Sequence, residues 1–159
     1  MILHTMDTLL RTTESSAILG AISTALDRSD EAPFWRQKSL PFCEAVLSVL
    51  IPLREQNLLF DPEGNPYSEL SPALFIRWCD LLSLRTLAFT LARSNDEGKL
   101  LRTKIDTDSY QSIDLEILGK YLSGYSVNLE NEMVDFPVTN YNLHLGMTSL
   151  ITKILEGKV

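Results

Sequence analysis

One stretch of the sequence decides the fold: residues 33–56, which read PFWRQKSLPFCEAVLSVLIPLREQ. Pro33 suits the first turn of a helix, because the N–H that proline lacks has no intrahelical partner there. Apolar residues form a broad surface along the rest of the stretch, at Phe34, Leu40, Val46, Leu47, Leu50, Ile51 and Leu53. The pattern predicts a central core helix that runs from Pro33 toward Gln56.

Two prolines, Pro41 and Pro52, interrupt this predicted helix. Proline removes a backbone donor and crowds the preceding turn, so each position predicts a kink or a break. We favour one long kinked helix over two short ones.

Apolar residues at helical spacing predict further helices on both sides of the central one. Their ranges are Glu14–Asp27, Pro72–Leu82, Ser83–Arg93, Ser112–Leu122 and Asn140–Leu155.

Capping residues mark several ends of these helices. Thr12 or Thr13 is the candidate N-cap of the helix Glu14–Asp27. Ser71 and Pro72 are the expected N-cap and first-turn residue of the helix Pro72–Leu82. Gly124 is placed to end the helix before it.

The segments between the helices are turns and loops. Residues 61–66, DPEGNP, form the clearest turn, while residues 99–109 and 125–139 are expected to be irregular. No strand is predicted. We therefore expect an all-α fold, a compact bundle of five to six helices around one long central helix, with residues 1–159 forming a single domain.

Composition excludes several classes of protein. The chain has 159 residues, of which 45% are hydrophobic and 22% charged, and its formal net charge is −7. These values exclude a collagen, a coiled coil and a wholly disordered chain. The acidic balance argues against free-standing nucleic-acid binding, which depends on Lys and Arg neutralising phosphates.

The N-terminus and the cysteines bear on the compartment. MILHTMDTLL lacks the basic and continuously apolar regions of a signal peptide, and no stretch approaches the ~18 apolar residues of a membrane span. Cys43 and Cys79 sit in apolar, helix-like surroundings. Parity alone permits a disulfide, but two buried thiols in a reducing cytosol are favoured.

A search for chemistry finds no catalytic, cofactor or metal site. The histidines, His4 and His144, are far apart in the sequence, and neither a C-x-x-C nor an H-E-x-x-H pattern is present. His144 is expected to be an ordinary histidine at a helix interface. The three Gly-Lys pairs lack the rest of a P-loop, and no G-x-S-x-G motif occurs. We expect no enzymatic activity from this segment.

The basic and aromatic residues give little evidence for a nucleic-acid or ligand site. Lys99, Arg102 and Lys104 form the densest basic cluster, but residues 94–126 hold four Lys/Arg against six Asp/Glu, a local net charge of −2. Such a segment could contact a phosphate or two and could not follow a duplex. Trp78 is expected in the core, and the exposure of Trp35 stays open.

Five short motifs follow one another along the chain: APFWR (residues 32–36), PLRE (52–55), LSPALFIR (70–77), LSL (82–84) and LHLGMTSL (143–150). Their order resembles the all-α domain of type IV secretion coupling proteins, the ATPases that feed substrate into conjugation and Dot/Icm-like machines, and most closely their IcmO/TrbC/TraD-like branch. Residues 5–93 and 140–157 carry the resemblance. The chain departs from it at Ala32, where an acidic residue is expected, and at Pro41 and Pro52, which disturb the central helix.

The resemblance implies a place within a larger protein. In that family the all-α domain is inserted into a RecA-like motor domain, between its nucleotide-binding motifs, on the cytoplasmic face of a hexameric, inner-membrane-anchored ring. The Walker motifs and the membrane anchor would then lie outside residues 1–159, as expected for an excised domain.

The resemblance also implies a function, the recruitment of relaxosome components, effector substrates or adaptor proteins. An acidic domain suits a basic protein partner. The candidate partner-binding residues lie in two acidic loops, and they are Asp96, Glu97, Glu130, Glu132 and Asp135. A free-standing helical adaptor or regulatory module is the main alternative, and a small helical enzyme is a third.

Overall fold

The computed structural model describes residues 2–28, 33–92, 99–105, 107–110, 112–124 and 138–156. Within these ranges the backbone is helical or irregular, and its one pairing of extended segments is an isolated bridge between Phe60 and Pro66. The predicted all-α fold is confirmed. The helices are α1 (Ile2–Thr12), α2 (Ser15–Asp27), α3 (Pro33–Glu55), α4 (Pro72–Arg77), α5 (Leu81–Ala92), α6 (Lys99–Arg102), the 3-10 helix η2 (Thr107–Tyr110), α7 (Glu116–Ser123) and α8 (Val138–Leu155).

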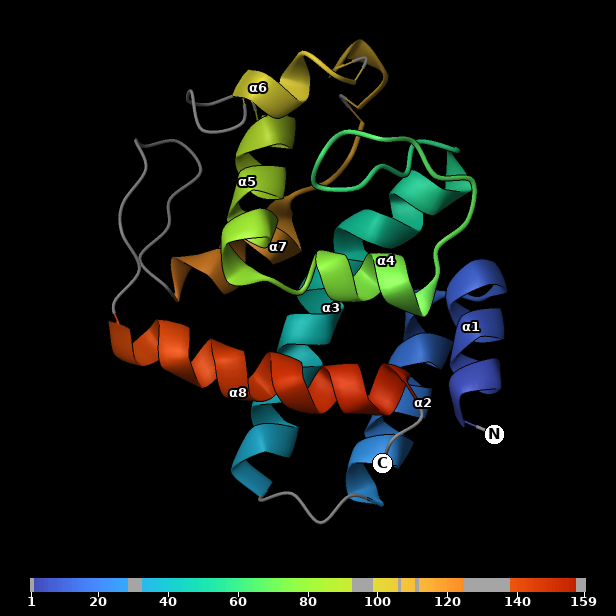
Figure 1. The fold of residues 1–159 in the computed structure, drawn as a ribbon, viewed down its shortest axis with the longest axis vertical. Helices are drawn as coiled ribbons and strands as arrows, with labels where there is room; N and C mark the ends of the chain where they lie inside the picture. The colour runs from blue at the N-terminus through green and yellow to red at the C-terminus, as the bar shows by residue number, and fades with distance from the viewer. Residues whose placement is uncertain are drawn as a thin grey trace.

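Helix α3 is central, as predicted. It packs most extensively against α2, α7 and α8, while α8 also contacts α1, α2 and α4. In Figure 1, α8 crosses in front of α3, and α1 and α2 lie on the opposite side of the molecule from α5 and α7. Helix α6 lies at the far end of the molecule, beyond α5.

Helix α3 continues without a break through Pro41 and Pro52. The prediction of one long helix, rather than two short ones, is confirmed. Pro41 is exposed and Pro52 is only half-buried, so neither ring needs space in the centre of the core. Fully buried residues occupy the rest of the helix, at Phe42, Cys43, Ala45, Val46, Leu47, Val49, Leu50 and Leu53.

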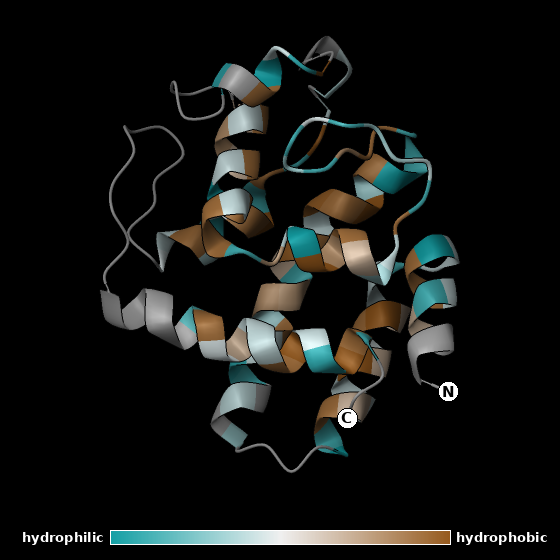
Figure 2. Cartoon of the chain, in the orientation of Figure 1, coloured by the Kyte–Doolittle hydropathy of each residue, from teal (hydrophilic) through white to brown (hydrophobic). Residues whose placement is uncertain are grey.

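Aromatic side chains fill another part of the core. Figure 2 shows apolar segments on both α3 and α4. The ring of Phe60 contacts Trp78 and Tyr110 edge-on, at centroid distances of 5.6 and 5.5 Å. The indole N–H of Trp78 donates to the carbonyl of Phe60 at 2.9 Å, which satisfies the one polar group of this buried side chain. Trp78 is therefore a core residue, as predicted.

Trp35 is half-buried, which settles the exposure that the sequence left open. Its ring lies against Gly146 of α8, where an added Cβ would come within 2.5 Å of the ring. Gly146 thus makes room for the indole, and the contact joins the start of α3 to α8.

Helix α1 was not expected, although Met6, Leu9 and Leu10 recur at helical spacing, and Met6 and Leu10 are buried. The proposed N-cap role of Thr12 or Thr13 is wrong. Both hydroxyls donate back to carbonyls of α1, from Thr12 to Thr8 and from Thr13 to Leu9, each at 2.7 Å. They end α1, and the N-cap position of α2 is Glu14.

The predicted boundary between the helices Pro72–Leu82 and Ser83–Arg93 is also wrong. Helix α4 ends at Arg77 and α5 begins at Leu81. The carboxylate of Asp80 accepts from the backbone N–H of Ser83 at 2.9 Å and from its hydroxyl at 3.1 Å. Asp80 therefore caps α5 and fixes where it starts. The N-cap role of Ser71 is confirmed, because its hydroxyl accepts from the N–H of Leu74.

Two further boundaries differ from the sequence prediction. Residues 99–109 were expected to form a loop, but they contain α6 and η2. Helix α7 begins at Glu116 rather than Ser112, because Asp114 accepts from the N–H of Glu116 and holds a turn before the helix. Gly124 ends α7 as predicted, in a right-handed conformation with φ −67°.

Candidate functional site

The candidate partner-binding residues lie outside the described residues. They are Asp96, Glu97, Glu130, Glu132 and Asp135; residues 125–137, which were expected to be irregular, also lie outside the described ranges. The described part of the chain defines what surrounds them in sequence: α5 and α6 flank the first pair, and α7 and α8 flank the other three.

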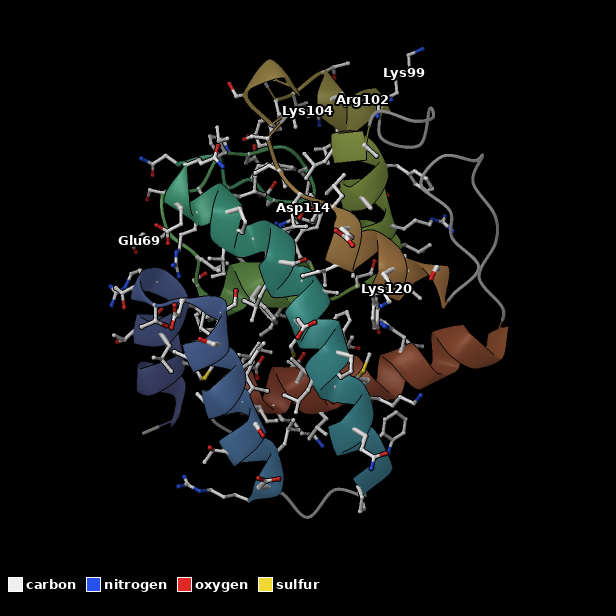
Figure 3. The ribbon with its side chains drawn as sticks, turned by 180° about the vertical axis from the view of Figure 1, so that it is seen from behind. Glu69, Lys99, Arg102, Lys104, Asp114 and Lys120 are labelled. Atoms are coloured by element: carbon white, nitrogen blue, oxygen red, sulfur yellow. The ribbon has the colours of Figure 1, made fainter. Side chains whose placement is uncertain are left out.

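The basic cluster lies at the α6 end of the molecule. Figure 3 shows Lys99, Arg102 and Lys104 together there, with Asp114 and Lys120 nearer α7. Arg102 donates from Nη1 to the carbonyl of Phe89 at 2.9 Å. That carbonyl belongs to the last turn of α5, where carbonyls lack intrahelical partners and positive charge is favoured. The Arg102 side chain therefore stabilises the C-terminal end of α5.

Lys104 is also tied to its surroundings. Its side chain passes close to Gly64, where an added Cβ would approach the Lys104 Cβ to 2.7 Å. Gly64 has φ +87°, a conformation that glycine adopts readily. The close approach joins the loop after α3 to the segment after α6.

Arg54 repeats the pattern of Arg102 at another helix end. Its Nη1 donates to the carbonyl of Leu10 at 2.7 Å, in the last turn of α1, and its side chain is only 8% exposed. The same guanidinium also binds the carboxylate of Glu55. Nothing in the sequence marks either contact, because Arg54 lies 44 residues from Leu10 and Arg102 lies 13 from Phe89.

The loop between α3 and α4 is organised around the buried carboxylate of Asp61. Oδ1 accepts from the backbone N–H groups of Glu63 and Asn65, at 2.9 and 3.0 Å, and Oδ2 accepts from the Asn65 amide at 3.2 Å. The Asp61 backbone adds two turn hydrogen bonds, from its N–H to the Asn65 carbonyl and from the Gly64 N–H to its carbonyl. The predicted turn at residues 61–66 is confirmed.

Arg77 closes this loop from α4. It pairs through Nη1 with Oδ2 of Asp61 at 3.3 Å and through Nη2 with the carboxylate of Glu63. Burial alone would raise the pKa of Asp61, but the hydrogen bonds from Asn65 and Glu63 and the charge of Arg77 together lower it. The carboxylate therefore stays ionised at neutral pH, with its acceptor positions used inside the fold.

The sequence predicted the turn and missed its buried acid. An Asp at the first position of a turn that also contains Gly64 and Asn65 is a recognisable signal for side-chain-to-backbone hydrogen bonding. The contact with Arg77 has no such signal.

Cys43, Cys79 and His144 are buried residues with reactive types of side chain. Cys43 and Cys79 are free and buried, which confirms the expectation of buried thiols. Burial raises the pKa of Cys43 to about 12, and burial together with the nearby Cys43 raises that of Cys79. Both thiols are protonated at neutral pH, a state that does not favour nucleophilic chemistry.

His144 is a buried interface residue, as predicted. It is 1% exposed, its Nε2 lies 2.7 Å from the carbonyl oxygen of Cys79, and its ring contacts Phe42 edge-on at 4.8 Å. Because a carbonyl only accepts, Nε2 carries the proton and donates. Burial lowers the pKa of His144, against the opposing effects of the Cys79 hydrogen bond and of Asp80.

Two surveys of the described residues complete the picture. No three His, Cys, Asp or Glu side chains among them are arranged to hold a metal ion. No described helix combines the length and apolar character needed to cross a membrane. Large apolar side chains with substantial exposure are spread over the loop after α3 and over α5, α7 and α8, at Tyr67, Leu82, Ile117 and Leu145.

Comparisons with protein-family models, with curated proteins and with solved structures gave no match for this chain.

Proposed function

We propose that this chain recruits protein partners as the all-α domain of a type IV secretion coupling protein, and that it binds a basic partner without enzymatic activity of its own. The proposed partner is a relaxosome component, an effector or an adaptor. The parent protein would be a hexameric ATPase anchored in the inner membrane, with this domain on the cytoplasmic side. The sequence motifs described above supply the link to the family.

One structural observation supports an acidic docking surface: four of the described arginines serve contacts within the fold, and many carboxylates face solvent, as do the arginines Arg11 and Arg28. Arg54 and Arg102 bind helix-end carbonyls, Arg77 binds Asp61 and Glu63, and Arg85 is buried at 5% exposure. The exposed acids include Glu14, Asp27, Glu44, Glu69, Asp114 and Glu116. With a net charge of −7, the surface therefore presents an excess of negative charge that favours a basic partner.

The test is capture of partners by the immobilised chain from a bacterial lysate, with elution by stepwise increases in salt and identification by mass spectrometry. We expect basic proteins to be retained at low salt and released as salt screens the charges. A parallel binding assay uses duplex DNA. Retention of duplex DNA that does not depend on salt contradicts the proposal.

Two variants of equal charge separate a specific docking surface from general attraction. The first neutralises the candidate loop residues, by Asp96→Asn, Glu97→Gln, Glu130→Gln, Glu132→Gln and Asp135→Asn. The second neutralises exposed acids on the described elements, by Glu14→Gln, Asp27→Asn, Glu44→Gln, Glu69→Gln and Glu116→Gln. Each set removes five negative charges, from −7 to −2. We expect the first to lose the partner and the second to keep most of the binding; the reverse order contradicts the assignment to the loops.

A separate test concerns the link to the coupling-protein family. The coding sequence on either side of residues 1–159 should encode a P-loop strand upstream and a Walker B strand downstream. A natural start codon at residue 1 together with a stop codon directly after residue 159 favours the free-standing adaptor instead.

A further inference from the structure

We draw no further inference here: the strongest candidate, the pair of buried thiols of Cys43 on α3 and Cys79 just after α4, rests only on the effect of Cys43 on the pKa of Cys79, which does not establish the sulfur-to-sulfur geometry that a disulfide or a two-thiol metal site requires.

Discussion

The apolar packing around α3 and the loop around Asp61 are stabilised by opposite kinds of interaction. Helix α3 buries a nearly continuous set of aliphatic and aromatic side chains, whose contribution depends on area and volume. The loop buries one carboxylate, whose contribution depends on four polar contacts, to Glu63, Asn65 and Arg77. Damage to the core should therefore scale with the atoms removed and be independent of pH, whereas damage to the loop should depend on charge.

The largest effect is expected for Leu50→Ala in α3. Leu50 is fully buried, so the truncation should lower the free energy of unfolding by about 2–5 kcal/mol through lost burial and a residual cavity. The matched control is Leu145→Ala, at a leucine of α8 that is 47% exposed, and it should change stability by less than about 1 kcal/mol. Urea unfolding at pH 7 measures both, and equal losses contradict the assignment of the core.

Asp61→Asn tests how much the buried carboxylate stabilises the loop between α3 and α4. The amide can replace one acceptor oxygen, but its NH₂ group then faces the donors of Asn65 and Arg77. We expect a loss of about 1–3 kcal/mol at pH 7.

The same variant should be less sensitive to acid than the wild type. Because the pKa of Asp61 is lowered in the folded state, its stabilisation is present above the unfolded value near 3.9 and is lost as the pH falls through the folded value. Unfolding curves of the two proteins at pH 7 and pH 3 should therefore converge at the lower pH. A difference that stays constant means that the carboxylate charge is not what stabilises the loop.

Two helical glycines offer a pair of substitutions with opposite signs. Gly146→Ala places a methyl group 2.5 Å from the Trp35 ring and should destabilise the fold by about 1–3 kcal/mol. Gly20→Ala in α2 meets nothing within 4 Å and should stabilise it by about 0.5–1 kcal/mol, because alanine loses less entropy in a helix. Thermal unfolding should order them as Gly20→Ala, wild type, Gly146→Ala. A rise in melting temperature for both substitutions rules out the tight contact with Trp35.

The smallest effect is expected at the end of α5. Arg102→Gln removes the guanidinium that binds the Phe89 carbonyl and should cost about 0.5–1.5 kcal/mol. The control Lys99→Gln lies in the same basic cluster, on an exposed side chain, and should change stability by less than about 0.5 kcal/mol. If both cost the same, the cluster stabilises the fold only through its overall charge.

The success of the sequence predictions depended on the range of the interactions involved. The central helix, the cap at Ser71 and the turn at residues 61–66 rest on neighbours within a few residues, and all three are confirmed. The errors at Thr12, Thr13 and Ser83 arose where two local signals competed. A threonine can end one helix or start the next, and only the packing of α1 against α2 selects the first choice.

The candidate site follows the same division. Its five acidic residues were chosen for their sequence context alone, and they lie outside the described ranges, so they remain a prediction. The residues that organise the described surface are arginines, and their roles depend on contacts that span up to 44 residues of chain. The sequence did not indicate these roles, because composition does not distinguish a cation in solvent from one that binds a helix-end carbonyl.

The sequence by itself determined that this chain is helical, that residues 33–55 form its central helix, and that its net charge is −7. These properties depend on hydrophobic periodicity, local capping and residue counts. Only the tertiary structure decided where the charges act: Arg54 and Arg102 at helix ends, Asp61 inside a loop, and His144 at the junction of α8 with α3. The physical reason is that burial sets how strongly a charge interacts with its neighbours, and burial depends on which distant segments of the chain pack together.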